Sequence, residues 1–242
     1  MKRKTNLILS LALVLLFSCS KDDAMRGDTG TGGSMARFTI LKDYLYAVDN
    51  ESLHTFGISQ PADIQHLHNQ YLGFGIETIF PSEDYLFIGA RDGMHIYGLT
   101  NPERPNKISF TPHFVSYDPV VVKGDFAYVT LRSGPNMGEN VLLVFDISRL
   151  NAPQIIAEYQ MTNPRGLGID NDRLFICDDV LKVFHVEENG YDIELLQTFD
   201  IPAIDVIPDD GRLYVVAEDG LYQYDYDGES ISFLSKLTIP KP

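Results

Sequence analysis

Cysteine and basic residues are both scarce in this chain of 242 residues. Only two cysteines occur, so the sequence offers no disulfide framework, and a buried core must supply the stability. Lysine and arginine number 19 against 34 aspartate and glutamate residues, which gives a net charge of −15. An acidic surface repels phosphate backbones, so the composition argues against nucleic acid as a partner.

Motifs for common chemistries are also missing. The sequence contains no nucleophile elbow, phosphate-binding loop, zinc cluster or dinucleotide fingerprint. We therefore expect no cofactor and no metal, and the absence of a catalytic motif favours a protein that is not an enzyme.

The N-terminus has the pattern of a secretory signal. Three basic residues, Lys2 to Lys4, precede an apolar run from Leu7 to Phe17, which is too short to cross a bilayer as a stable helix. The residues Leu16-Phe17-Ser18-Cys19 resemble the bacterial lipobox, in which the chain is cleaved before an acylated cysteine. This resemblance implies a signal peptide over residues 1–18 and a lipid anchor on Cys19, with an ordinary cleaved signal as the alternative.

The residues after Cys19 are polar. The stretch CSKDD, residues 19–23, resembles the tag that directs some lipoproteins of the Bacteroidetes to the outer face of the outer membrane, and a merely polar tether is the alternative. Gly, Ser and Thr dominate residues 27–34, so we expect a flexible tether over residues 19–35. The mature chain would carry a net charge of −18 (19 − 3 basic against 34 acidic residues). The predicted location is an outer membrane lipoprotein at the cell surface or, otherwise, facing the periplasm.

A segment of similar sequence recurs five times in the rest of the chain. The five copies begin at Tyr44, Tyr85, Phe126, Arg173 and Arg212, at intervals of 41, 41, 47 and 39 residues. A period near 40 residues is typical of radial repeat folds. The long third interval holds SGPNMGEN, residues 133–140, a turn-rich insertion between two strands.

Each copy predicts a short antiparallel meander. Two apolar runs flank a tight turn, such as Arg91-Asp92-Gly93 or Glu218-Asp219-Gly220, where Asp-Gly favours a hairpin. One further apolar run precedes each pair and another follows it, which gives four strands in each of five units.

Five four-stranded sheets can bury their faces by standing in a circle, so the sequence predicts an all-β, five-bladed β-propeller over residues 36–242. A β-sandwich is the alternative that the 40-residue period disfavours. The predicted blades are residues 36–72, 73–114, 115–162, 163–200 and 201–240.

Two columns of equivalent residues should pack between blades. The aromatic column is Phe56, Tyr97, Phe145, Phe184 and Tyr224, and the aliphatic column is Leu53, Met94, Leu142, Leu181 and Leu221. The first unit begins with its own first strand and the last ends with its own fourth strand. Closure between the first and fifth blades would therefore rest on packing alone.

The sequence VLLVFDISRLNAP, residues 141–153, resembles the LVIVD repeat, and MHIYGLTNPERP and LHTFGISQP do so more loosely. The fourth and fifth units depart from the pattern, because HVEENG and DYDGES contain no proline after the strand. The resemblance covers most of residues 36–240 and implies a bacterial propeller of the secreted or lipid-anchored kind. It carries no catalytic motif to transfer.

Propeller ligands usually meet the mouth of the central channel, where the first strand of each blade begins. Counting back from the second strands gives, within one residue, Arg37, Glu77, Asp118, Arg165 and Asp205. Such a ring could bind a sugar, a peptide terminus or a cation, or its charges could satisfy one another.

The leading functional hypothesis is a binding or protein-interaction module for an unknown protein or glycan. The alternative is a propeller hydrolase that acts on a carbohydrate or lactone-type substrate with Glu77, Asp118 and Asp205, provided that two carboxylates stand at glycosidase spacing.

Three remaining features have plain structural interpretations. His66 and His68 would project from one side of a strand and could share a metal, but no third ligand follows at a recognisable spacing. Cys177 lies at a small-residue strand position, so we expect a buried, inert thiol. The acidic stretches 170–172 and 208–211 are expected to be turns.

Overall fold

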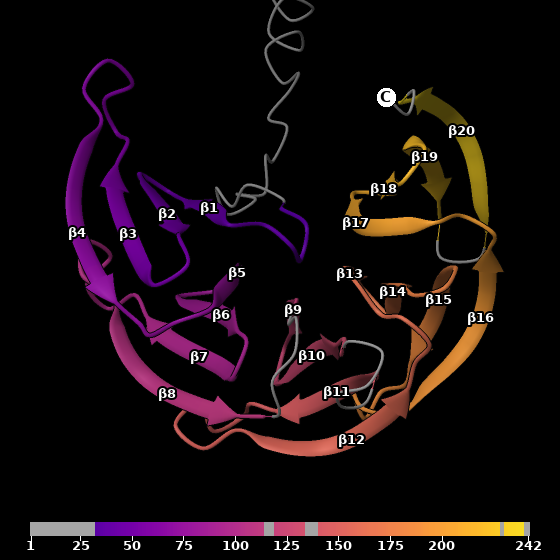
Figure 1. Ribbon diagram of the computed structural model, residues 1–242, viewed down its shortest axis with the longest axis horizontal. Helices are drawn as coiled ribbons and strands as arrows, with labels where there is room; N and C mark the ends of the chain where they lie inside the picture. Colours follow the sequence, from indigo (N-terminus) through magenta and orange to yellow (C-terminus); the bar gives the residue numbers. More distant parts are fainter. Residues whose placement is uncertain (1–31, 114–118, 134–139, 228–229, 240–242) are drawn as a thin grey trace, which may run out of the picture.

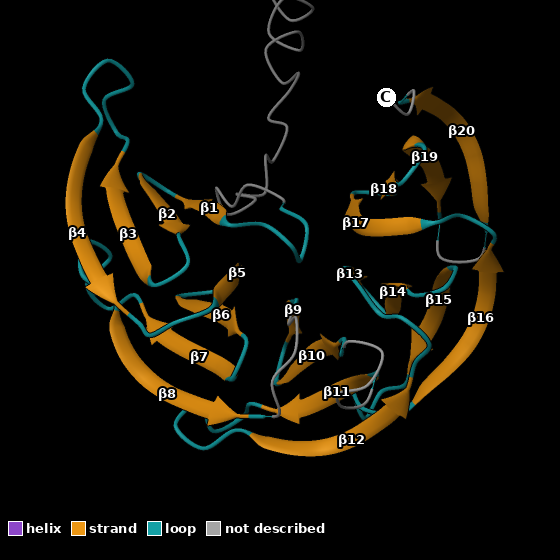
Figure 2. Cartoon of the chain, in the orientation of Figure 1, coloured by secondary structure: helices purple, strands orange, loops and turns teal. Residues whose placement is uncertain are grey.

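The computed structural model describes residues 32–113, 119–133, 140–227 and 230–239, which form five antiparallel four-stranded sheets standing around a common axis (Figure 1). The chain is thus a five-bladed β-propeller, as the 40-residue period predicts. In these described ranges the regular elements are all strands, and no helix is available that could span a membrane (Figure 2).

The twenty strands follow one another in sequence order from the axis outward in every blade. The first blade contains β1 (Phe38–Leu41), β2 (Tyr44–Val48), β3 (Ser52–Gly57) and β4 (Gln65–Tyr71). The second contains β5 (Ile76–Ser82), β6 (Tyr85–Ala90), β7 (Gly93–Gly98) and β8 (Asn106–Pro112). The third contains β9 (Val120–Lys123), β10 (Phe126–Leu131), β11 (Val141–Asp146) and β12 (Gln154–Gln160). The fourth contains β13 (Leu167–Asp170), β14 (Arg173–Cys177), β15 (Leu181–Val186) and β16 (Ile193–Phe199). The fifth contains β17 (Ala203–Asp209), β18 (Arg212–Ala217), β19 (Gly220–Tyr226) and β20 (Ile231–Thr238).

The turn between the first and second strand of every blade has the same backbone conformation. One residue of each turn has a φ between 48° and 54°, in the left-handed region: Lys42, Glu83, Gly124, Asn171 and Asp210. Because only one of the five is glycine, the other four adopt a conformation that L-residues reach at some cost. Of the two acidic stretches expected to be turns, residues 171–172 and 210–211 form turns, while Asp170, Pro208 and Asp209 end the strands that precede them.

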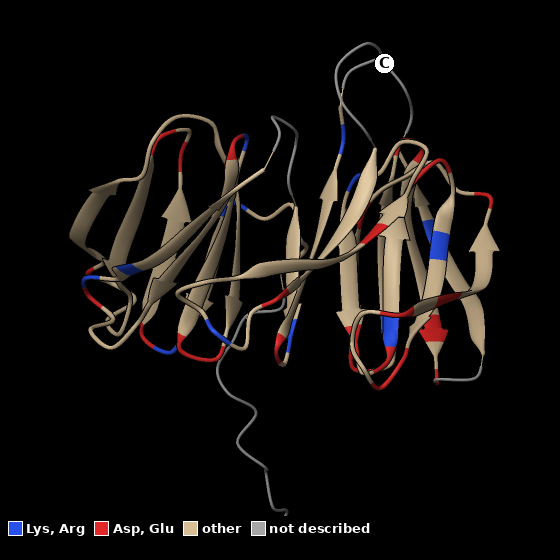
Figure 3. Cartoon of the chain, turned by 90° about the horizontal axis from the view of Figure 1, so that it is seen from below, with Lys and Arg blue, Asp and Glu red and all other residues tan. Residues whose placement is uncertain are grey.

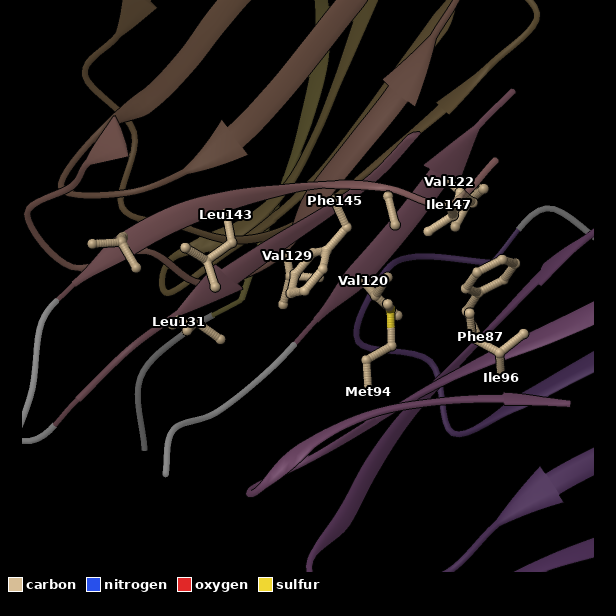
Figure 4. Packing of buried hydrophobic residues seen from close by; sticks show 12 residues of the cluster. Phe87, Met94, Ile96, Val120, Val122, Val129, Leu131, Leu143, Phe145 and Ile147 are labelled. Atoms are coloured by element: carbon tan, nitrogen blue, oxygen red, sulfur yellow. The ribbon is translucent and has the colours of Figure 1, made fainter. Parts of the chain in front are cut away.

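Consecutive blades pack through four separate apolar clusters. The cluster between the second and third blades joins Phe87, Met94 and Ile96 to the valines and leucines of β9, β10 and β11 (Figure 4). Equivalent clusters join the first blade to the second, the third to the fourth, and the fourth to the fifth. The interior is therefore built from blade-to-blade contacts rather than from one central core.

The two predicted columns face opposite ways. Tyr97, Phe145, Phe184 and Tyr224 each pack toward the preceding blade, and Leu53, Met94, Leu142 and Leu181 each pack toward the following one. These eight residues confirm the predicted packing. Phe56 does not, because no blade precedes the first along the chain, and its face is only half-buried.

The ring is open between the first and fifth blades, and we call this gap the seam. The two blades diverge outward on either side of it (Figure 1). Among the described residues, no buried apolar cluster joins them. The packing on which closure of the ring would rest is absent between these two faces, whose apolar side chains remain exposed.

Every fourth strand carries a β-bulge at an equivalent place, opposite the middle of the third strand. The extra residue is always aliphatic: Leu67, Ile108, Ile156, Leu196 and Leu234. The bulge bends the outer strand and increases its twist. Many of the charged residues lie in the turns at the two ends of the blades, and some lie within strands (Figure 3).

Candidate functional site: the channel mouth

The backbone register fixes which residues stand level at the mouth of the channel. Arg37 and Asp205 occupy equivalent positions, opposite Val48 and Val216 of the neighbouring second strands. The equivalents in the other blades are Thr78, Pro119 and Gly166, each one residue beyond the predicted position. The hairpins that join the first two strands have the same length in every blade, so the one-residue offset is an error of counting back along the sequence. The β-bulge at Glu77 lies beyond Thr78 on the mouth side and does not produce the offset.

Glu77 and Arg165 therefore stand one residue nearer the rim than Arg37 and Asp205. Asp118, the fifth predicted member, lies outside the described residues. The ligand-binding role of all five residues stays a prediction.

Arg37 reaches across to the second blade. Its guanidinium Nη2 donates a hydrogen bond to the carbonyl oxygen of Ile76 at 3.0 Å, directly before Glu77. The side chain thus links the start of β1 to the start of β5 on the mouth side.

Arg165 is engaged with a neighbouring blade. Its Nη2 lies 3.1 Å from Oε1 of Glu218, which belongs to the turn between β18 and β19. Its carbonyl oxygen accepts a hydrogen bond from the hydroxyl of Thr130 in the third blade at 2.5 Å. Arg165 therefore ties the third, fourth and fifth blades together at the mouth.

Asp205 is the most enclosed carboxyl group at the mouth. Its Oδ1 accepts a hydrogen bond from the hydroxyl of Ser34 at 3.1 Å, and the backbone N–H groups of Met35 and Val206 also donate to the carboxylate. Burial nevertheless dominates and raises the pKa of Asp205 to about 6. This side chain thus changes charge in a pH range where few carboxyl groups do.

The segment Gly33–Met35 crosses the inner part of the seam. The hydroxyl oxygen of Ser34 accepts a hydrogen bond from the backbone N–H of Leu167 at 2.8 Å while the hydroxyl donates to Asp205. A Cβ atom at Gly33 would lie 2.1 Å from Oδ2 of Asp205, so only glycine fits there. Gly33 and Ser34, near the end of the predicted tether, are thus buried against the fourth and fifth blades, whereas Met35 is exposed.

The contact of Ser34 with the fourth and fifth blades was not predicted from the sequence. Ser34 lies 133 and 171 residues from its two partners, and its Gly/Ser-rich surroundings are those of a linker. Glu218, the partner of Arg165, was likewise not among the predicted site residues.

Several hollows lie along the blades, and two of them differ clearly in lining. A cavity of about 260 Å³ opens between inner strands and is lined mostly by apolar side chains, including Phe80, Val121, Leu167 and Val206. A larger hollow of about 1200 Å³ lies between the third and fourth blades, at the end remote from the mouth. Acidic residues dominate its rim, and Tyr128 forms part of its wall.

The histidine pair does not form the arrangement expected from the sequence. The bulge at Leu67 separates His66 from His68, so His66 pairs with Phe56 and His68 with Thr55, on opposite faces of the sheet. His66 instead packs its ring 5.1 Å from that of Phe56. In the described part of the chain, no group of three candidate ligands could hold a metal ion.

Cys177 is fully buried in the cluster between the fourth and fifth blades. Burial raises the pKa of its thiol well above the usual value, so the reactive thiolate is disfavoured. Its burial agrees with the sequence interpretation.

Similarity to known proteins is found at the level of the fold and not of the sequence. No protein-family model matches the chain, and no curated protein matches its sequence. A protein of unknown function from Desulfotomaculum acetoxidans is similar in structure, with a TM-score of 0.67 at 12% identity, over 88% of this chain and 69% of that one. The periplasmic gluconolactonase of Pseudomonas aeruginosa is similar with a TM-score of 0.61 at 16% identity, over 84% and 68% of the two chains. BamB from Moraxella catarrhalis gives a TM-score of 0.57 at 10% identity, over 80% and 56%. These likenesses show the propeller fold, while membership of the LVIVD repeat family is not shown.

Proposed function

We propose that the chain is a lipid-anchored, extracytoplasmic β-propeller that acts as a non-catalytic binding or protein-interaction module. On this proposal residues 1–18 are removed, Cys19 carries the lipid, and the following residues connect the anchor to the first blade. The charge pattern of the N-terminus and its resemblance to a lipobox support the anchor. The LVIVD-like repeat, which resembles that of secreted or lipid-anchored propellers, supports an extracytoplasmic location, and the stretch CSKDD supports the outer membrane.

The engagement of the charged groups at the channel mouth carries the binding proposal. Arg165 is paired with Glu218, Arg37 holds a backbone carbonyl, and Asp205 accepts hydrogen bonds from the segment Gly33–Met35. Groups fixed in this way form a rigid polar surface, which suits recognition of a hydrogen-bonding protein or glycan. Acid/base catalysis instead needs carboxyl groups that exchange protons with a substrate.

Binding at the mouth is tested by replacing its three acidic candidates together, Glu77→Gln, Asp118→Asn and Asp205→Asn. Peptide and glycan arrays should be probed with the unaltered protein and with the triple variant. We expect some peptides or glycans to bind the unaltered protein and not the triple variant. The matched control replaces Asp43, Asp84 and Asp125 with Asn, because these exposed residues lie in turns at the opposite end of the blades. Loss of binding in the control alone would remove the mouth from the proposal.

The anchor is tested at Cys19. Cys19→Ala should give a chain that stays in the soluble fraction after cell disruption, whereas Cys177→Ala should remain with the membranes. Membrane association of Cys19→Ala that resists alkaline washing would contradict lipid anchoring.

A hydrolase is the second candidate, and one observation favours it. The pKa of about 6 at Asp205 would allow this carboxyl group to serve as an acid or a base near neutral pH. One of the structurally similar proteins is a gluconolactonase, so a lactone is the first substrate to test, together with aryl glycosides.

Hydrolysis of gluconolactone above the buffer rate, lost in Asp205→Asn and kept in Asp209→Asn on the same strand, would support the hydrolase and count against a purely binding role. A rate equal to that of buffer with both substrate classes would exclude the candidate.

A further inference from the structure

The four closed blade interfaces follow a single rule. At each one, the face that carries the aliphatic column of one blade meets the face that carries the aromatic column of the next. The residue pairs across the four interfaces are Leu53 with Tyr97, Met94 with Phe145, Leu142 with Phe184, and Leu181 with Tyr224. All eight side chains are at most 8% exposed.

One face of each kind is left over at the seam. On the first blade, Phe38 is 60% exposed, although its equivalents Ile79, Val120, Leu167 and Val206 are at most 1% exposed. On the fifth blade, Leu221 is 37% exposed and Leu237, which pairs with it, is 67% exposed. Ile40 and Val216 extend the same two faces and are also exposed.

The two leftover faces therefore differ in kind. The first blade presents the aromatic-column face, with Phe56 at its centre, and the fifth presents the aliphatic-column face, with Leu221 at its centre. Within the chain, these two kinds of face always pack against each other. Among the described residues, the hydrogen-bonded bridge across the seam is Gly33–Met35 near the axis, and this segment leaves the outer strands uncovered. Contiguous apolar surface of this type marks an interaction site.

We propose that a second copy of this chain covers the seam, with the aromatic-column face of each first blade against the partner's fifth blade. Every chain carries one face of each kind, so a two-fold arrangement makes the same contact twice and leaves neither face exposed. The arrangement adds no new chemistry, because the contact repeats the one already made four times inside each chain.

Electrostatics gives the proposed dimer a recognisable signature. Each chain carries a net charge of −15, so two copies repel one another at low salt. Salt screens this repulsion and leaves the apolar contact intact. The dimer should therefore become stronger as the salt concentration rises, unlike an association held by ion pairs.

The experiment measures mass by sedimentation equilibrium and light scattering on the chain lacking residues 1–18, from about 1 to 100 μM protein and about 0.05 to 0.5 M salt. We expect a concentration-dependent dimer whose dissociation constant falls at least fivefold over this salt range. A monomer throughout, or species larger than a dimer, would overturn the proposal.

Two single variants identify the faces. Phe38→Asp and Leu221→Lys should each weaken the dimer at least tenfold, and their unfolding temperatures as monomers should match that of the monomeric parent chain because both sites are exposed. Leu195→Asp is the matched control: Leu195 lies on β16, away from the seam, is 51% exposed, and should leave the dimer unchanged. Dimerisation of either seam variant at the parental strength would contradict the proposed contact.

Mixing the two variants decides whether unlike faces meet. A heterodimer of Phe38→Asp with Leu221→Lys has one unaltered contact. Its other contact contains both substitutions, which carry opposite charges. Each homodimer has an altered residue in both contacts. The mixture should therefore dimerise more tightly than either variant alone, whereas an absence of restoration would overturn the assignment of unlike faces.

Discussion

The interface between the third and fourth blades and the seam between the fifth and first are built from the same two columns of residues. At the closed interface, Leu142 and Phe184 are buried in one apolar cluster. At the seam, Leu221 and Phe56 lie on opposite sides of the gap and do not pack against each other. The composition of the two columns does not explain the difference, because Leu221 and Phe56 are as apolar as Leu142 and Phe184. The difference shows that burial in this fold depends on having a neighbouring blade at the right angle, which the local sequence of a blade does not provide.

The largest expected difference is in the free energy of unfolding when leucine is replaced by alanine at a closed interface and at the seam. Leu142→Ala should lower the free energy of unfolding by about 2–5 kcal/mol, because it leaves a cavity in a packed interface. Leu221→Ala should lower it by less than about 1 kcal/mol, because the side chain is already partly in water. Urea unfolding in dilute, monomeric protein checks both values, and similar losses at the two sites would mean that the seam is closed in solution.

The bridge at the inner end of the seam should respond to pH. The folded pKa of Asp205 is raised to about 6 from an ordinary value of 3.8, so the folded state holds its proton longer than the unfolded chain does. The contribution of this group to stability is therefore fully present below about pH 4 and is lost as pH rises toward 6, by up to about 3 kcal/mol.

Asp205→Asn removes this titration. The unfolding free energy of the unaltered protein, minus that of the variant, should fall between about pH 4 and pH 6. Asp209→Asn, an exposed substitution on the same strand, should give no such slope, and a flat difference for Asp205→Asn would mean that the carboxyl group is well hydrated. Thermal or urea unfolding across this pH range supplies the measurement.

A smaller effect is expected where one loop meets the closed interface of the third and fourth blades. The hydroxyl of Tyr128 is buried and donates to the carbonyl oxygen of Gly190 at 2.6 Å, while that of Tyr159 donates to Tyr191 at 2.7 Å in an exposed setting. Tyr128→Phe should cost about 1–2 kcal/mol, because a buried carbonyl loses its partner. Tyr159→Phe should cost less than about 0.5 kcal/mol because water replaces the hydroxyl. Equal costs would show that the loop is not closed over Tyr128.

The smallest effect is expected for the ion pair at the channel mouth. Glu218→Gln removes the charge opposite Arg165, and because Glu218 is exposed the unfolding free energy should change by less than about 1 kcal/mol. The change should shrink further in high salt. A larger loss would indicate that Arg165 holds the three blades together more strongly than its exposure suggests.

The fold could be predicted from sequence for a physical reason that applies to each blade separately. Strand alternation and turn residues act over a few positions, so Tyr97, Phe145, Phe184 and Tyr224 align at one spacing and reach the expected neighbour. Phe56 has the same local sequence context but no preceding blade. The repeat pattern therefore could not predict that Phe56 is only half-buried.

The candidate site was less accessible to prediction. Counting back from the second strand missed Thr78, Pro119 and Gly166 by one residue, although the hairpins have the same length in every blade. The β-bulge at Glu77 was not predicted either, because a bulge leaves no fixed mark in composition. The aliphatic residue at each outer bulge, such as Leu67, likewise became visible only from the pairing of strands. Ser34 looked like part of a linker because its two partners are distant in sequence.

The sequence by itself determined the number of blades, the strands within them and the two apolar columns that pack between blades, since these follow from periodicity and turn chemistry. Tertiary structure alone decided that the circle stays open, that Ser34 and its neighbours bridge the gap, and that Asp205 titrates near pH 6. Those outcomes depend on angles between whole sheets and on desolvation by distant residues, neither of which is encoded in any short stretch of chain.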